Sequence, residues 1–254
     1  MPNPLKVIIN GAAGRTGHYV AECIADDDTV TVAAGVDKVE FNCDFPLYPS
    51  ISEVNESADA IIDFSNASTL DELLKYATEK KVPLVLATTG YSEKQIDEIK
   101  AAAESIPVFF SFNMSLGINL VCSLVKQAAT VLGKNFDVEI IEKHHNQKLD
   151  APSGTAIMLA DAVNGVFDDS MVYEYDRHSK RAKRSENEIG IHSVRGGTIV
   201  GEHEVIFAGN NETVTISHSA ASRSIFATGA VNAAKFIVDK EPRLYDMNDL
   251  INGI

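Results

Sequence analysis

The run Leu5-Lys6-Val7-Ile8-Ile9-Asn10-Gly11-Ala12-Ala13-Gly14-Arg15-Thr16-Gly17 determines the architecture of the first half of the chain. Leu5–Ile9 has the composition of a short buried strand, and the glycines that follow at once allow a tight turn. His18–Ala25 then shows helical spacing of apolar residues, and Val30–Val36 has the composition of a second strand. Strand, glycine turn, helix and strand make a βαβ unit, in which backbone N–H groups approach a pyrophosphate at the helix N-terminus.

The glycine spacing is G-x-x-G-x-x-G, which alone is a weak signal, because a structural glycine turn looks the same. Asp37 ends the second strand, twenty residues after Gly17, where an acidic residue can bind the ribose of a dinucleotide. Asp37 favours a free 2′-hydroxyl and hence NADH. Lys38 either pairs with a 2′-phosphate or is a solvated surface lysine. We therefore expect a nicotinamide dinucleotide, with use of both NADH and NADPH.

The rest of the first half alternates between strands and helices. Apolar strands are expected at 60–64, 83–87 and 107–110, with helices at 69–80 and 92–104. Such strands suit a parallel sheet covered on both faces, and ligands bind at the carboxyl ends of its strands. The polar segments 87–89 and 111–114 follow two of these strands. Either they line a ligand site or they are simple turn residues.

The second half has a different pattern. A helix is expected at 117–132, and strands joined by short glycine-containing turns are expected at 189–194, 198–207 and 213–218. Short connections predict a mainly antiparallel sheet, hence an α+β domain. Its His192, His203 and His218 are read as sheet-face histidines and not as metal ligands. The helix at 223–238 should return to the first domain, so residues 1–114 with 223–254 form one domain and 115–222 the other.

A polar cluster lies between a strand at 136–141 and a helix at 156–163. It reads Glu142-Lys143-His144-His145-Asn146-Gln147-Lys148-Leu149-Asp150-Ala151-Pro152-Ser153-Gly154-Thr155. Histidine exchanges protons near neutral pH, and a lysine anchors an anion or donates a proton. Pro152 prevents an earlier helix start, and Ser153 suits an N-cap. The free N–H groups of the first turn would favour a carboxylate or phosphate. The alternative is a polar loop before an ordinary capped helix.

Bulk properties restrict the partners. The net charge of −14 argues against nucleic acid and anionic membranes, and 45% apolar residues support a real core. Three widely spaced cysteines predict neither disulfides nor a metal site. There is no signal-peptide pattern, and no apolar run is expected to approach membrane-spanning length, so we expect a cytoplasmic protein. The basic cluster 180–184 within the polar segment 168–188 predicts a mobile loop or a lid over an anionic ligand.

The run from Glu139 to Thr155 resembles the signature of the dihydrodipicolinate reductase family. The resemblance covers nearly the whole chain, including Gly11–Gly17, Ala87–Gly90 and Asn113–Asn119. It implies a Rossmann-like α/β domain and a second domain whose sheet builds a homotetramer. It also implies reduction of a cyclic unsaturated imine dicarboxylate by NADH or NADPH, in the diaminopimelate route to lysine. The rival interpretations are another two-domain dehydrogenase, of the homoserine or aspartate type, and a non-catalytic sensor of NAD(P)H.

The resemblance also implies residue roles. His144 matches the proton donor or acceptor and Lys148 a second proton donor. His145 and the helix start at Ser153, Gly154 and Thr155 match the positions that hold the substrate carboxylates. Dinucleotide contacts are expected at Gly11, Ala12, Ala13, Gly14, Arg15, Thr16, Asp37, Lys38, Ala87, Thr88, Thr89, Ser111, Phe112, Asn113 and Met114.

Overall fold

The computed structural model describes residues 3–253. The chain divides into two compact units, one of Met1–Leu116 with Arg223–Ile254 and one of Gly117–Ser222. The first unit is therefore built from both ends of the chain, and the second is a continuous insertion into it.

The first unit contains one parallel sheet. Within the described residues its seven strands follow the order β12-β6-β5-β4-β1-β2-β3. Because β1 has β2 on one side and β4 on the other, the direction of strand addition reverses at β1, which is where such sheets bind ligands. The strands are β1 (Leu5–Asn10), β2 (Val30–Val36), β3 (Leu47–Tyr48), β4 (Ala60–Asp63), β5 (Leu84–Leu86), β6 (Val108–Phe110) and β12 (Leu244–Tyr245).

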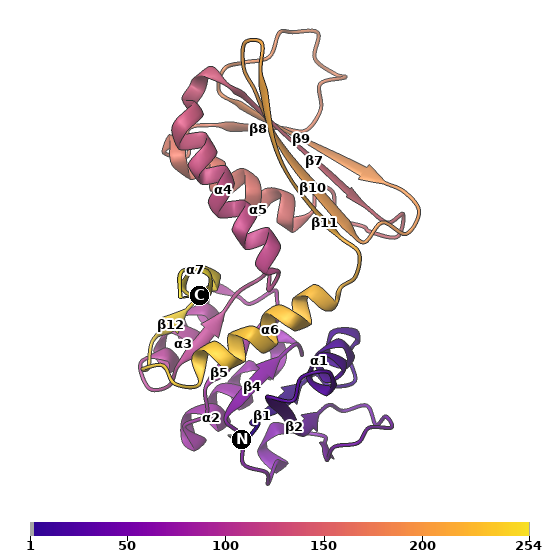
Figure 1. Cartoon of the computed structure of the whole chain (residues 1–254), viewed down its shortest axis with the longest axis vertical. Coiled ribbons are helices and arrows are strands. Elements are labelled where there is room, and N and C mark those ends of the chain that lie inside the picture. The colour runs from indigo at the N-terminus through magenta and orange to yellow at the C-terminus, as the bar shows by residue number, and fades with distance from the viewer. Residues whose placement is uncertain (1–2, 254) are drawn as a thin grey trace. The chain divides into compact units, whose positions relative to one another are not determined.

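Helices cover both faces of this sheet (Figure 1). Val7 and Ile9 of β1 face a core shared with α1, α6 and α7, whereas Ile8 faces a core shared with α2 and α3. The alternation follows from the period of two of a strand and confirms the predicted Rossmann-like sheet. The helices are α1 (Arg15–Ala25), α2 (Leu70–Lys80), α3 (Glu93–Ala103), α6 (Ser224–Ile237) and α7 (Met247–Asn252), with short 3-10 turns η1 (Ile51–Glu53) and η2 (Ala67–Thr69).

The second unit places two helices on one face of a five-stranded sheet (Figure 1). Its core joins apolar residues of both helices to β7, β9 and β10. The described strands follow the order β11-β10-β7-β9-β8. They are β7 (Asp137–His144), β8 (Val172–Glu174), β9 (Glu188–Arg195), β10 (Gly201–Ala208) and β11 (Thr213–Ala220), and the helices are α4 (Leu116–Leu132) and α5 (Gly154–Asn164), followed by the 3-10 turns η3 (Gly133–Asn135) and η4 (Gly165–Phe167).

The predicted α+β second unit is confirmed, but its sheet is mixed and not mainly antiparallel, because two of its strand pairs are parallel and two are antiparallel. β7 lies between β9 and β10, parallel to the first and antiparallel to the second. The glycine-containing segment after β9 is therefore not a hairpin turn: it passes the end of β7, where the Gly196 N–H donates to the His144 carbonyl at 2.9 Å. In the central position, Val138 and Ile140 of β7 are buried under the helices. At an edge of the sheet these two side chains would be only half covered.

The polar segment 168–188 is partly ordered by pairing. It contains β8, which the sequence pattern did not predict, and two cations of its basic cluster pair with acids of the same unit. Arg184 binds Asp137 at 2.9 Å and Glu139 at 3.0 Å, and Lys180 is paired with Glu174. Because these cations are already neutralised, they offer little charge to an outside anion. A lid function stays a prediction.

The α4 segment is longer and more apolar than the sequence interpretation allowed. Leu116–Asn135 has 20 residues and a mean hydropathy of 1.4, which is enough to span a membrane by length and composition alone. The statement that no run approaches that length is thus wrong. Ile118, Val121 and Val125 pack into the core of the second unit, as expected for a core helix of an α/β protein.

The packing of α6 predicts one large stability effect. A Cβ at Gly229 would lie 1.7 Å from the Met114 carbonyl oxygen, so Gly229→Ala forces α6 away from the backbone. We expect a loss of about 1–3 kcal/mol in the free energy of unfolding. Gly165→Ala is the control, because Gly165 has an αR backbone and open space around its Cβ position. Urea unfolding of both variants tests this, and equal midpoints would contradict it.

Candidate active site

The glycine turn of the first unit is shaped by close backbone approaches. Gly11 has φ +85°, and a Cβ there would lie 2.7 Å from the Phe64 carbonyl carbon. A Cβ at Gly17 would lie 2.2 Å from the Gly11 carbonyl oxygen. Gly14 is the N-cap of α1 and supplies no side-chain cap, so no cap side chain occupies the N–H groups of the first turn. Such a helix N-terminus favours a phosphate.

Asp37 is fixed to this turn. Its carboxylate accepts hydrogen bonds from the Ala13 N–H and the Val39 N–H, each at 3.0 Å. A pocket of about 540 Å³ lies beside it and is lined by Gly11, Gly14, Asp37 and Lys38 among others. The structure therefore brings together the residues predicted to hold the ribose and pyrophosphate end of a dinucleotide.

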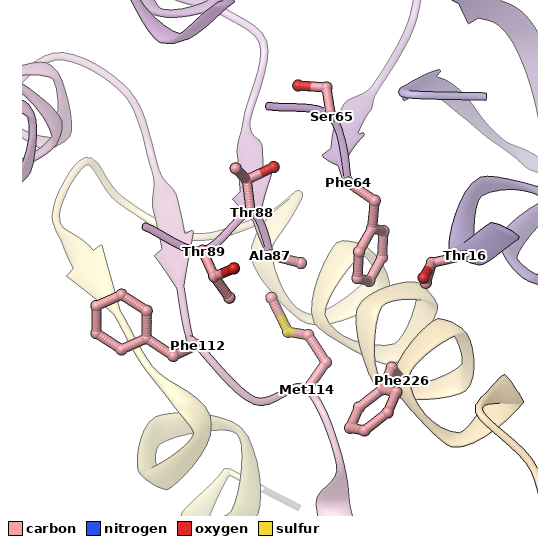
Figure 2. Close-up of a pocket in the computed structure, with 9 residues that line it drawn as sticks. All are labelled: Thr16, Phe64, Ser65, Ala87, Thr88, Thr89, Phe112, Met114 and Phe226. Atoms are coloured by element: carbon pink, nitrogen blue, oxygen red, sulfur yellow. The ribbon is translucent and has the colours of Figure 1, made fainter. Parts of the chain in front are cut away.

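A second pocket, of about 280 Å³, lies along the same unit (Figure 2). Of the predicted residues, its lining includes Thr16, Ala87, Thr88, Thr89, Phe112 and Met114. Figure 2 also shows Phe64 and Ser65, from the end of β4, and Phe226, from α6. Because Phe64 and Ser65 line both pockets, the two hollows adjoin at the carboxyl ends of β1 and β4.

Five predicted cofactor residues line neither pocket: Ala12, Ala13, Arg15, Ser111 and Asn113. Ala12 is buried, and its N–H is bonded to the Val36 carbonyl. Arg15 lies exposed in the first turn of α1. Ser111 and Asn113 close the turn after β6, where the Asn113 N–H donates to Ser111 Oγ and that hydroxyl donates to the Asn113 carbonyl. These side chains shape the turns around the pockets.

Phe64, Ser65 and Phe226 were missed by the sequence interpretation. Phe64 and Ser65 directly follow a strand, so the argument from strand ends could have found them. Buried Asp63 accepts a hydrogen bond from Ser65 Oγ at 2.5 Å and one from Asn10 Nδ2 at 2.8 Å. Burial raises the pKa of Asp63, which these hydrogen bonds oppose. The place of Phe226 in the pocket was not predicted from any local pattern, because this residue comes from the far end of the chain.

The polar cluster of the second unit is centred on Glu142 of β7. Its side chain is 0% exposed and shares a face of the strand with His144. Both Arg195 Nη atoms donate to it, at 2.6 and 2.7 Å, and the Ser153 N–H donates at 3.1 Å. Burial raises the pKa of Glu142, but the hydrogen bonds, led by those from Arg195 and His144, bring it down to about 2. The carboxylate is therefore ionised at neutral pH.

His144 is held by this carboxylate. Its Nδ1 lies 2.6 Å from Glu142 Oε2, and its ring meets the His203 ring edge-on with centroids 5.2 Å apart. Burial lowers the pKa of His144, while Glu142 acts in the opposite direction. Lys148 pairs with Asp150 at 2.8 Å and adds positive charge near His144. A neutral imidazole and an ammonium thus lie in one polar cluster.

The predicted helix start is confirmed. Ser153 is the N-cap of α5, and its Oγ accepts from the Ala156 N–H at 3.1 Å and lies 3.0 Å from His203 Nε2. The Ser153 side chain is therefore committed within the protein, whereas Gly154 is exposed with open space at its Cβ position. His145 and Thr155 are half-buried.

Three residues of this cluster were not predicted as site residues: Glu142, Arg195 and His203. Glu142 lies two positions before His144 in a strand, so period-two spacing could have revealed it. The role of Arg195 was not predicted, because its approach to Glu142 depends on β9 pairing with β7. His203 does lie in a sheet, as expected, but on the buried face beside Ser153. The described residues hold no group of three or more potential metal ligands.

Known families match both parts of the chain. Residues 5–114 match the family model described as "Dihydrodipicolinate reductase, N-terminus", and residues 117–251 match "Dihydrodipicolinate reductase, C-terminus". A protein named 4-hydroxy-tetrahydrodipicolinate reductase from Caldanaerobacter subterraneus subsp. tengcongensis is 53% identical over 97% of this chain and 98% of its own. The protein of the same name from Clostridium tetani is 45% identical, covering 98% of each chain.

A solved structure shares the fold. It is the dipicolinate-bound dihydrodipicolinate reductase from Paenisporosarcina sp. TG-14, with a TM-score of 0.81 at 23% identity, covering 96% of this chain and 99% of that one. The two family matches together span nearly the whole sequence. The relatives at 53% and 45% identity also match this chain over almost their full length. The chain belongs to the dihydrodipicolinate reductase family.

Proposed function

We propose that this protein reduces 4-hydroxy-tetrahydrodipicolinate to tetrahydrodipicolinate with a nicotinamide dinucleotide, the 4-hydroxyl group leaving as water, as a step of the diaminopimelate route to lysine. One observation carries this proposal: a strand end and a helix start bring His144, Lys148 and the first turn of α5 into one polar cluster. The full-length identity to proteins named for this reaction supports it.

The first unit would hold the dinucleotide. The uncapped first turn of α1 fits a pyrophosphate, and the two adjoining pockets provide space on either side of it. When bound, the nicotinamide supplies a hydride. Thr16, Ala87 and Met114 line the pocket that would receive its ring.

The ribose end favours NADH. Its pocket is lined by three carboxylates, Asp37, Asp71 and Glu72, against the single cation Lys38. A 2′-phosphate would bring further negative charge close to these groups, whereas a 2′-hydroxyl can donate to Asp37. Lys38 is the residue that would support a weaker use of NADPH.

The second unit would hold the dicarboxylate and deliver the proton. The N–H groups at the start of α5, around Gly154 and Thr155, and the ammonium of Lys148 favour carboxylates. Each helix-end contact contributes about 0.3–1 kcal/mol when exposed. This local charge offsets the net charge of −14 of the whole chain, whose longer-range field is screened by salt. His144, or a water that it orients, would supply the proton, with Lys148 as a second donor.

We also expect a homotetramer and a cytoplasmic location. The sheet face away from α4 and α5 carries half-exposed Glu139, Ile141 and Lys143. This open face is the surface available for a second copy. Three free cysteines suit a reducing compartment.

The first prediction concerns turnover. Substrate is generated in situ from pyruvate and aspartate semialdehyde, and it should cause oxidation of NADH. The loss of NADH absorbance measures the rate. His144→Ala and Lys148→Ala should each lower kcat by ~10²–10⁴-fold, because each removes a proton-transfer group. His178→Ala and Lys183→Ala, both on exposed positions, serve as controls. Binding of NADH without oxidation would instead favour a sensor or a dehydrogenase with another substrate.

The second prediction concerns the cofactor. The wild type should show a lower KM for NADH than for NADPH. Asp37→Asn removes the charge that disfavours a 2′-phosphate and weakens ribose binding, so the ratio of the two KM values should move toward NADPH by roughly 10-fold, as for a hydrogen bond to a charged group. Lys38→Ala should raise only the KM for NADPH. A many-fold NADPH preference of the wild type would remove the ribose role from Asp37.

The third prediction concerns assembly. Sedimentation equilibrium should give a particle of four 27.4 kDa chains. Ile141→Lys places a charge on the open sheet face and should shift the mass toward smaller species, because an unpaired charge opposes burial. Val131→Lys is the control, since Val131 is a 77% exposed residue of α4. A monomeric wild type would refute the tetramer.

A further inference from the structure

Glu142 pairs with four donor atoms that come from three residues of the second unit. Oε1 accepts from Arg195 Nη2 at 2.6 Å and from the Ser153 N–H at 3.1 Å. Oε2 accepts from Arg195 Nη1 at 2.7 Å and lies 2.6 Å from His144 Nδ1. Arg195 thus forms a two-pronged ion pair with a fully buried carboxylate, which is the geometry of strong charge-assisted pairing. Neither residue has a role in the proton transfer described above.

The charge of this carboxylate settles which nitrogen of His144 carries the proton. With a pKa of about 2, Glu142 is ionised at every pH at which the protein is expected to work, so it accepts hydrogen bonds and cannot donate one. The 2.6 Å contact then requires a proton on His144 Nδ1. The second nitrogen, Nε2, makes no bond to Glu142 and lies 3.2 Å from the Cβ position of Gly201.

We propose that the Glu142–Arg195 ion pair is the positioning device of the proton-transfer site: it holds His144 in the tautomer protonated at Nδ1, so that Nε2 is the reacting nitrogen. This inference rests on the proposed reductase function. In the step itself, His144 first takes up a proton from solvent at Nε2, and the imidazolium so formed gives that proton to the carbon next to the one that receives hydride. His144 then returns to the neutral form with its proton on Nδ1.

Arg195 also joins this ion pair to the loop that carries Lys148. Its Nη2 donates to the Asp150 carbonyl at 2.6 Å, and Asp150 pairs with Lys148 at 2.8 Å. The Ser153 N–H, bonded to the same carboxylate, fixes the residue that caps α5. One buried anion therefore holds the imidazole, the lysine loop and the helix start together.

The charges that face His144 act in opposite directions. Burial has the largest effect and lowers the pKa of His144. The Glu142 carboxylate on β7 raises this pKa, whereas the positive charges of Lys148 on the loop and Arg195 on β9 lower it. His203 on β10 is a further titratable neighbour, and burial lowers its pKa to about 4, so it stays neutral. Replacing Glu142 by a neutral residue must therefore lower the pKa of His144, and replacing Arg195 must raise it.

The experiment compares Glu142→Gln with the wild type in the reductase assay over a range of pH. The amide can donate to Nδ1 and so permit the wrong tautomer, which in the Ser-His-Asp triad costs about 10⁴-fold in kcat. We expect a ~10²–10⁴-fold fall in kcat with KM nearly unchanged. The inflection that belongs to His144 should move to lower pH, and in Arg195→Gln it should move to higher pH. A general loss of structure would not produce opposite shifts.

Glu139→Gln is the matched control. Glu139 lies three residues earlier on β7, on the other face, and also pairs with an arginine and a histidine: Arg184 Nε at 3.0 Å and His192 Nε2 at 2.8 Å. Sedimentation of each variant ensures that the same assembly is compared. For Glu139→Gln we expect the kcat of the wild type and an unshifted pH profile. If Glu139→Gln and Glu142→Gln fall equally, the positioning role is refuted.

A spectroscopic measurement tests the tautomer without turnover. Solid-state ¹⁵N spectra of histidine-labelled protein separate protonated from unprotonated ring nitrogens, and His144→Gln identifies the signals of His144. We expect a protonated Nδ1 and an unprotonated Nε2 in the neutral form of the wild type. A proton on Nε2 instead would overturn the inference even if the reductase is active. The expected tautomer in a protein without reductase activity would leave the proposed function, and not the geometry, at fault.

Discussion

A carboxylate without solvent contact is the constraint on which the second unit depends. An ionised group that is fully buried must be paired and hydrogen-bonded, or folding stability is lost. Glu142 meets this demand only when β9 supplies Arg195 and the chain before α5 supplies the Ser153 N–H. The order of the strands, the start of α5 and the orientation of His144 are thus linked through one anion. This explains why β7 occupies the middle of the sheet, with β9 and β10 beside it.

The two units treat anions in different ways. In the first, the helix N-terminus of α1 is left uncapped, and the glycines of the turn allow backbone to approach backbone. In the second, the start of α5 is capped by Ser153 and anchored to a buried ion pair. Open amides suit a cofactor that comes and goes with each turnover, whereas an anchored helix start suits the precise placement of a proton. Both devices act locally, so an acidic chain can still bind anionic ligands.

Local patterns allowed much of the fold to be predicted. The βαβ unit, the Ser92 and Ser153 caps and the discontinuous layout follow from apolar period, glycines and cap residues. Pairing between distant strands is not encoded in any short stretch, so β7 was not placed between β9 and β10. For the same reason the role of Arg195 was not predicted, because its contact with Glu142 depends on the pairing of β9 with β7. For the site, the family resemblance located His144 and Lys148 in the cluster, while Phe226 could not be found because a helix from the other end of the chain brings it to the pocket.

Alternate residues of β7 lie on opposite faces of the sheet. Val138, Ile140, Glu142 and His144 face the helices, and Glu139, Ile141 and Lys143 face away from them. A strand has a period of two, so inserting or deleting one residue exchanges its faces. Such a change would carry Glu142 and His144 to the open side and bring Lys143 under α5. Over evolutionary time this strand can therefore change by substitution of single residues but not in length. Substitutions on its outer face occur on the same backbone that carries the proton-transfer site.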